Sequence, residues 1–385
     1  MWLVDGIAGF GSWLLIGAPA FLFILTVVVF FHELGHFWVA RRCGVTIDVF
    51  SVGFGPELIG RTDRHGTRWK LAAVPLGGYV KFHGDENAAS MPDAEAIEHM
   101  SEDERKISLA GQSVWRRMAI VAAGPIANII LAILIFTGLF TIYGQHLTAP
   151  KVESVLVDSA AEAAGLKPGD VVLSIDGRGI ESFSDIQAIV TLSADTPIEI
   201  VLDRGGERIA VTAVPKRQEM TDPFGNKHRV GVLGISRSVS RDDVIVKRYS
   251  LPEAFVIGTK ETYNVVERSF TYLGRLIRGR ESTDQLGGPI RIAKTSGDVA
   301  AVGFSALINM MAIISVSIGI LNLFPIPVLD GGHLLYYAIE AIRGRPLSAR
   351  VQDYGFRIGF ALILMLIIFV TSNDIISIVS QHMSG

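Results

Sequence analysis

The chain has 385 residues, of which 49% are hydrophobic and only 19% are charged, and its mean hydropathy is +0.41. This composition is too apolar for an ordinary soluble enzyme of this length. The formal net charge is -3 and no basic stripe with interleaved aromatic residues occurs, which excludes a typical nucleic-acid-binding protein. Cys43 is the single cysteine, so the chain forms no intrachain disulfide bond.

The hydrophobic residues gather in four stretches that approach or reach the length of a membrane-spanning helix, about 20 residues. The predicted spans are 18–40, 118–143, 304–324 and 356–378. The segment before the first span contains Asp5 and no lysine or arginine, whereas a signal peptide begins with positive charge. We therefore expect the first span to be retained.

Basic residues indicate which loops face the cytoplasm. They are concentrated after the first span and between the last two spans, at Arg41, Arg42, Arg61, Arg64, Arg68, Lys70, Arg116, Arg117, Arg343, Arg345, Arg350 and Arg357. By the positive-inside rule both loops are cytoplasmic. The termini and the long segment from residue 144 to about 302 then face the other side of the membrane.

These features predict a polytopic α-helical membrane protein with an inserted α+β module. The predicted parts are an N-terminal membrane half at 1–143 with a cytoplasmic loop at 45–84, the module and its tail at 144–249, an amphipathic linker at 250–302 and a C-terminal membrane half at 303–385. In the linker, apolar residues from 252 to 278 recur at helical spacing. This pattern favours a helix on the membrane surface, although packing against the module would produce the same pattern.

The outer module alternates strand and helix patterns over a short distance. Strands are predicted at 151–157, 170–175, 198–203 and 207–214, and a helix at 184–192. The loop Gly165-Leu166-Lys167-Pro168-Gly169-Asp170 resembles that of PDZ domains in bacterial envelope proteases. The resemblance implies that an extended peptide binds as an added strand, with Gly165, Leu166, Gly169 and Asp170 as candidate peptide-binding residues. The alternative is a loop that merely turns, because glycine and proline occur in any turn.

The sequence His32-Glu33-Leu34-Gly35-His36 lies in the first predicted span. Histidines at positions i and i+4 share one helix face, so both imidazoles can reach one metal ion while Glu33 accepts a proton from water. The same letters occur by chance on solvated helices. Within a membrane helix, however, unpaired ionisable groups cost at least about 2.5 kcal/mol each, and a metal ion supplies their partner.

Catalytic zinc takes three protein ligands plus water, so a third ligand must come from elsewhere. The run from Asn322 to His333, at the cytoplasmic end of the third span, lies on the same side of the membrane as His32 and His36. From chemistry alone either Asp330 or His333 could bind the ion.

Together, H-E-x-x-H in a first span, a PDZ-like insert and N-x-x-P-x-x-x-x-D-G in a later span resemble the site-2 protease family. The resemblance is closest to its RseP-type bacterial members, which are intramembrane zinc metalloproteases. It implies one Zn²⁺ per chain held by His32, His36 and Asp330, with Glu33 as the catalytic residue. It also implies a substrate-binding role for Asn322 and leaves His333 outside the ligand set.

Further motifs extend the resemblance over nearly the whole chain. The run Pro75-Leu76-Gly77-Gly78-Tyr79-Val80-Lys81 looks like the family's cytoplasmic membrane-reentrant β-hairpin, so Gly77, Gly78 and Tyr79 are candidate substrate-binding residues. The run Gly124-Pro125-Ile126-Ala127-Asn128 allows close helix packing, and Asn128 is a weaker site candidate. The run from Gln285 to Ile290 also matches but suggests no chemistry.

The resemblance implies an endopeptidase of the bacterial inner membrane that cleaves single-pass membrane proteins such as anti-sigma factors and remnant signal peptides. It further implies a periplasmic PDZ domain that screens substrates already trimmed by a site-1-type protease. One PDZ copy is visible, whereas some relatives carry two. The alternative is a membrane adaptor or a metal-binding transporter that uses the same ligands without proteolysis.

Overall fold

The computed structural model describes residues 16–84, 100–221, 227–236, 244–278 and 287–383. Four of the described helices are long and apolar enough to cross a membrane, as predicted: α2 (Ala18–Arg42), α5 (Val114–Ile142), α10 (Phe304–Asn322) and the stretch Arg350–Ile376 of α12 (Ala349–Met383). The fourth helix begins earlier than the predicted residue 356. Residues 1–15, on which the expectation of a retained first span depends, lie outside the described residues.

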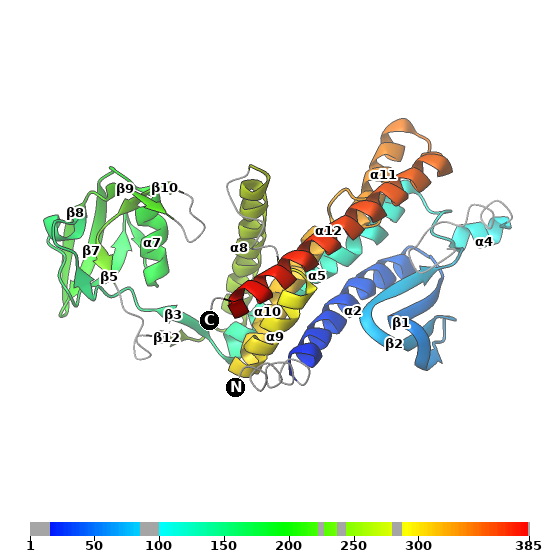
Figure 1. Cartoon of the computed structure of the whole chain (residues 1–385), viewed down its shortest axis with the longest axis horizontal. Helices are drawn as coiled ribbons and strands as arrows, with labels where there is room; N and C mark the ends of the chain where they lie inside the picture. The colour runs from blue at the N-terminus through cyan, green and yellow to red at the C-terminus, as the bar shows by residue number, and fades with distance from the viewer. Residues whose placement is uncertain (1–15, 85–99, 222–226, 237–243, 279–286, 384–385) are drawn as a thin grey trace. The chain divides into compact units, whose positions relative to one another are not determined.

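The linker contains two helices: α8 (Leu251–Ile277), where the apolar spacing at 252–278 predicted one, and α9 (Pro289–Val302). The loop expected between the last two spans contains a further helix, α11 (Asp330–Arg343). The short helix α11 begins at the predicted metal ligand Asp330, so it fixes the position of that residue (Figure 1).

Helix α8 packs through small residues on the C-terminal part of α5. Ala254, Gly258, Thr262 and Val265 form its buried face. A Cβ atom on Gly258 would lie only 2.9 Å from the backbone nitrogen of Thr137, so the two helices are in close contact there. This helix therefore has a packing partner that neither predicted alternative included.

Between α2 and α5 the chain forms a curled β-hairpin of β1 (Ile47–Thr62) and β2 (Arg68–Phe82), followed by the short helix α4 (Glu102–Ile107). Phe50 lies opposite Val80 on one side and Trp69 on the other, so the first part of β1 pairs with both ends of β2. Phe50 is fully buried and its ring stacks on Trp69 with centroids 4.3 Å apart. Phe37 of α2 contacts both rings, which anchors the hairpin to the half of α2 that carries the histidines.

The outer module is a separate compact unit. Its four-stranded antiparallel sheet has the order β6-β5-β7-β8, built from β5 (Val171–Ile175), β6 (Arg178–Gly179), β7 (Ile198–Arg204) and β8 (Glu207–Ala213). The remaining elements are β3 (Gln145–Thr148), β4 (Ser154–Val155), α6 (Ala160–Ala163), α7 (Phe183–Leu192), β9 (Lys216–Thr221), β10 (Lys227–Val232), β11 (Ile235–Ser236) and β12 (Val244–Lys247).

The module has its own hydrophobic core of branched aliphatic residues from β5, β7 and α7. The predicted strand at 151–157 is reduced to β4 and an isolated bridge from Lys151 to Val171. Strand β4 pairs with β11, and β3 pairs with β12. The first strands of the module therefore pair with its last strands.

Candidate active site

Helix α2 presents the two histidines on one buried face. His32 and His36 are each 8% exposed, and their Nε2 atoms lie 3.2 Å apart. Between them, Gly35 meets α5 closely: a Cβ atom there would lie 2.3 Å from the carbonyl oxygen of Ala123. The missing side chain therefore lets the histidine-bearing turn lie directly against α5.

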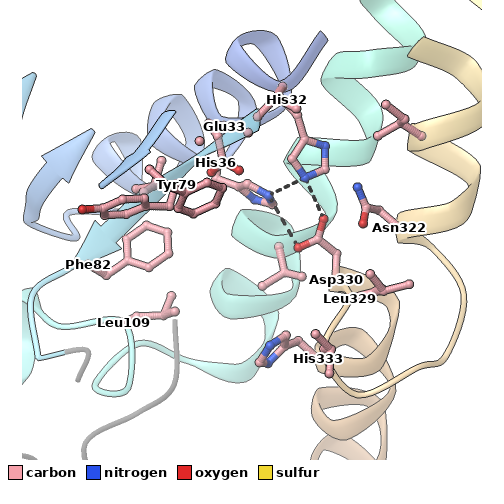
Figure 2. A pocket seen from close by; sticks show the side chains of 18 of the residues that line it. His32, Glu33, His36, Tyr79, Phe82, Leu109, Asn322, Leu329, Asp330 and His333 are labelled. Carbon is pink, nitrogen blue, oxygen red and sulfur yellow. Dashed lines mark hydrogen bonds and ion pairs between the residues drawn. The ribbon is translucent and has the colours of Figure 1, made fainter. Parts of the chain in front are cut away.

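A third group reaches the histidines from a position almost 300 residues away in the sequence. Asp330 Oδ2 lies 3.1 Å from His32 Nε2, and Asp330 Oδ1 lies 3.5 Å from His36 Nε2 (Figure 2). Asp330 begins α11, and the two residues that follow must be small. Side chains at Gly331 and Gly332 would lie within 2.4 Å of the carbonyl oxygens of the preceding loop.

The arrangement fits a zinc ion. His32, His36 and Asp330 each offer a ligand atom, and these atoms lie within 4.8 Å of one another. Zinc ligands stand about 2.0–2.2 Å from the ion in a tetrahedron, which separates any two of them by about 3.3–3.6 Å. The observed separations of 3.1, 3.2 and 3.5 Å lie within about 0.2 Å of that range. Asp330 Oδ2 is also buried and has no hydrogen-bond partner in the described residues.

His333 lies one turn beyond Asp330 on α11. It lines the same pocket, but Figure 2 shows its ring directed away from His32, His36 and Asp330. The structure therefore brings Asp330, and not His333, to the two histidines. The sequence alone had left both open.

The motif Gly124 to Asn128 forms the wall behind the imidazoles. A Cβ atom on Gly124 would lie 2.3 Å from His36 Nε2 and 2.9 Å from His32 Cε1, so only glycine leaves room for both rings. The Nδ1 atom of His36 donates to the carbonyl of Ile120 at 2.9 Å. The amide of Asn128, which is fully buried, lies 3.3 Å from His32 Nδ1.

Strand β2 brings the predicted substrate-binding residues beside Glu33. Gly78 lies against Glu33 Cγ, and a Cβ atom there would also lie 2.7 Å from the carbonyl oxygen of Ser51. The backbone N–H of Val80 donates to the Glu33 carboxylate. Gly77 has φ of 143°, and its bare Cα leaves room for the Phe54 ring. Glycine at both positions lets the strand pass close to α2.

These residues line a pocket of about 690 Å³. Its walls come from α2, β2, α5, α10 and α11, and include all of His32, Glu33, His36, Gly77, Gly78, Tyr79, Asn322, Asp330 and His333. Asn322 ends α10, and its amide is directed toward the histidine and aspartate cluster (Figure 2). The pocket combines a metal-ligand set, a carboxylate and a strand in one cavity.

Two contacts of charged side chains were missed by the sequence analysis. Arg117 at the start of α5 donates to both carboxylate oxygens of Glu340 on α11, at 3.1 and 2.5 Å. This pair ties α11, and hence Asp330, to α5. The partners lie 223 residues apart, and their only signal was the presence of charge beside a predicted span.

The second contact explains the motif around Gly288. Asp374 of α12 is 1% exposed and accepts hydrogen bonds from the backbone N–H groups of Gly288 and Arg291, at 3.0 and 2.9 Å. The carboxylate therefore satisfies the N-terminus of α9, where backbone donors have no partner within the helix. The other part of that motif, up to residue 286, lies outside the described residues.

In the outer module the predicted peptide-binding loop makes internal contacts. Leu166 is 4% exposed and belongs to the module's core, and Asp170 is 1% exposed. Hydrogen bonds from Arg204, together with one from the backbone of Lys167, lower the pKa of Asp170 although burial acts in the opposite direction. These two side chains are therefore occupied. A peptide carboxylate at this loop would have to bind through the loop's backbone, whose turns rest on Gly165 and Gly169, both at positive φ.

Comparison with protein families matches residues 20–366 to the model of Peptidase family M50. A protein of Agrobacterium fabrum with the provisional name zinc metalloprotease is 52% identical over 359 residues, which covers 93% of this chain and 95% of that protein. Metalloprotease MmpA of Caulobacter vibrioides is 43% identical and covers 94% of this chain and 96% of its own. Among solved structures, the PDZ domain of an SdrC-like protein from Listeria monocytogenes matches 23% of this chain and 86% of its own, with 21% identity and a TM-score of 0.19.

Proposed function

The chain belongs to peptidase family M50, and we propose that it is a zinc-dependent endopeptidase that cleaves membrane-spanning proteins within or beside their transmembrane segments. The observation that carries the proposal is the convergence of His32, His36 and Asp330 beside Glu33 in a pocket among candidate membrane helices. A metal-binding adaptor or transporter would need the ligands but has no use for a carboxylate held beside them.

In the proposed mechanism His32, His36 and Asp330 hold the zinc ion. When bound, zinc supplies a Lewis acid that polarises the scissile carbonyl and makes water a better nucleophile at neutral pH. Glu33 accepts a proton from the attacking water and then donates it to the leaving amine nitrogen. The N–H of Val80 orients the Glu33 carboxylate for these transfers.

We propose that the substrate binds as an extended strand along Gly77–Tyr79, because that stretch of β2 lines the pocket beside Glu33. A helical substrate hides its carbonyls in intrahelical hydrogen bonds, so it must unwind before attack. Asn322, directed toward the metal-ligand cluster, is placed to hold the substrate backbone (Figure 2). Helix-breaking residues near the cut should therefore raise the cleavage rate.

The distribution of basic residues supports a bacterial inner-membrane location with the active site near the cytoplasmic face and the outer module in the periplasm. We propose that this module is PDZ-like and screens single-pass substrates, such as anti-sigma factors and remnant signal peptides, after an upstream site-1-type protease has trimmed them. With Leu166 and Asp170 occupied internally, steric exclusion of untrimmed substrates is the simpler means of screening.

The decisive experiment compares wild type with Glu33→Gln, using the purified full chain in detergent and a single-pass reporter substrate. Because Glu33 is not part of the ligand set, the variant should retain one zinc ion per chain while cleavage falls by at least about 100-fold. Glu57→Gln, at an ion-paired carboxylate on the hairpin, is the matched control and should cleave normally. Cleavage by Glu33→Gln at the wild-type rate would reject the protease mechanism.

A second experiment tests the screening role. Strands β3 and β12 pair with Thr148 opposite Val244, so residues 149–243 can be replaced by a two-residue Asn-Gly turn that closes a hairpin. The shortened protein should cleave untrimmed and trimmed reporters equally well, whereas the full chain should prefer the trimmed reporter. An unchanged preference after the excision would remove the module from substrate selection.

A further inference from the structure

We propose that Asn128 is a positioning residue that holds the His32 imidazole in the tautomer that binds zinc, an inference that rests on the proposed metal site. Asn128 lies on α5, one helical turn after Gly124, and is fully buried. It does not belong to the ligand set. Its side chain contacts the far side of a ligand ring, at the nitrogen that does not face Asp330.

The two histidines have different partners behind the metal site. A neutral imidazole carries one N–H, so a ring that binds metal through Nε2 carries its hydrogen on Nδ1. For His36 this tautomer is fixed, because the carbonyl of Ile120, 2.9 Å from Nδ1, can only accept. For His32 the partner is the Asn128 amide, which presents either an acceptor oxygen or a donor nitrogen.

The orientation of this amide decides whether His32 can act as a ligand. With its oxygen toward Nδ1, the ring donates there and the lone pair of Nε2 is available to the metal. With its nitrogen toward Nδ1, the ring must carry its hydrogen on Nε2, 3.1 Å from Asp330 Oδ2. The amide nitrogen faces the ring, and the buried oxygen Oδ1 has no hydrogen-bond partner in the described residues.

An amide can therefore present either an acceptor or a donor to His32, which a backbone carbonyl cannot do. Among the described residues, no hydrogen bond to Oδ1 opposes the rotation that turns the oxygen toward His32. The backbone of Asn128 is held firmly: Ser315 Oγ donates to its carbonyl oxygen at 2.8 Å, and Gly319 packs against its Cβ atom. Helix α10, which ends at Asn322, thus fixes the residue that orients a ligand on α2.

The test measures zinc affinity of the purified full chain by competition with a chelator, and the number of imidazole ligands by zinc X-ray absorption. Asn128→Leu keeps the side-chain volume but cannot hydrogen-bond, and should weaken zinc binding by about 10- to 100-fold and remove one imidazole from the spectrum. Asn128→Asp keeps an acceptor toward His32 and should stay within about threefold of wild type. Thr137→Val, a buried polar position on the same helix, should leave zinc affinity unchanged.

Wild-type zinc affinity in Asn128→Leu would overturn the proposal. An equal loss of zinc affinity in folded Asn128→Leu and folded Asn128→Asp would also overturn it, because Asn128 would then act through packing alone. If thermal unfolding with chelator present shows that Asn128→Leu does not fold, the spectrum of Asn128→Asp decides. Two imidazoles support the proposal, and one overturns it. A wild-type chain that binds no zinc, or Glu33→Gln that still cleaves, would instead reject the proposed function.

Discussion

Replacing Gly124 by alanine tests the metal site with a single methyl group. The added Cβ atom would lie 2.3 Å from His36 Nε2 and 2.5 Å from its Cε1 atom. The shortest ordinary contact of a Cβ atom is 3.4 Å, so the imidazole must move by about 1.1 Å or α5 must withdraw from α2. Either movement pulls His36 Nε2 away from the point where the ligands converge.

The size of the effect follows from the tolerance of zinc coordination. Ligand distances in zinc sites stay within about 0.2 Å of their ideal values, far less than the required displacement. We expect zinc affinity to fall by at least about 10-fold, and cleavage by about 100-fold, the usual result of a 1 Å misplacement. Overpacking of this kind also lowers the free energy of unfolding by about 1–3 kcal/mol.

The matched control is Gly138→Ala on the same helix, where an added Cβ atom meets nothing within 4 Å. Alanine favours a helix over glycine by about 1 kcal/mol, so this variant should be as stable as wild type or more stable, with normal zinc binding. Chelator competition and cleavage of a single-pass reporter measure both variants. Full zinc affinity and activity in Gly124→Ala would refute the close approach of α5 to the imidazoles.

Three further predictions concern charges away from the ligand set. Breaking the Arg117–Glu340 pair with Glu340→Gln should lower the free energy of unfolding by about 1–3 kcal/mol in thermal melts and weaken zinc binding, because α11 carries Asp330; unaltered zinc affinity would contradict this coupling. Asp374→Ala should lower the free energy of unfolding by a similar amount without changing zinc affinity, because it leaves the N-terminus of α9 uncapped. The lowered pKa of Asp170 stabilises the module above about pH 3.9, its unfolded value, and this contribution disappears as the pH falls further; proteolysis of the module should therefore increase on acidification in wild type but change less in Asp170→Asn.

The parts of the site that follow from local geometry could be predicted from the sequence. Two histidines four residues apart must share a helix face, so their convergence required no tertiary information. The choice between Asp330 and His333 did require it, since the two lie on the same helix three residues apart. The path of the loop before α11 and the contact of Glu340 with Arg117 set how α11 lies, with Asp330 toward the histidines.

Contacts between segments far apart in the sequence could not be predicted from local sequence patterns. The local run Gly124 to Asn128 marked Asn128 as a weaker site candidate, but it could not show that its partner is His32, 96 residues away. In the run Gly165 to Asp170, the polar end suggested a side chain that could bind a peptide. Asp170 instead forms an ion pair with Arg204, 34 residues later, which closes the turn within the module.

Glycines at helix contacts help to place the metal-binding residues of this protein. Apolar side chains gain little by leaving lipid for another helix, so helices in a membrane associate through close packing at small residues. Here α2 meets α5 at Gly35 and Gly124, α10 meets α5 at Gly319, and α11 closes on its preceding loop at Gly331. Each contact brings a metal ligand, or the residue behind a ligand, to the common centre. Binding of an ion there adds to the free energy of unfolding, and the gain grows with the logarithm of the ion concentration divided by its dissociation constant. Zinc removal should therefore loosen the packing of these helices as well as stop catalysis.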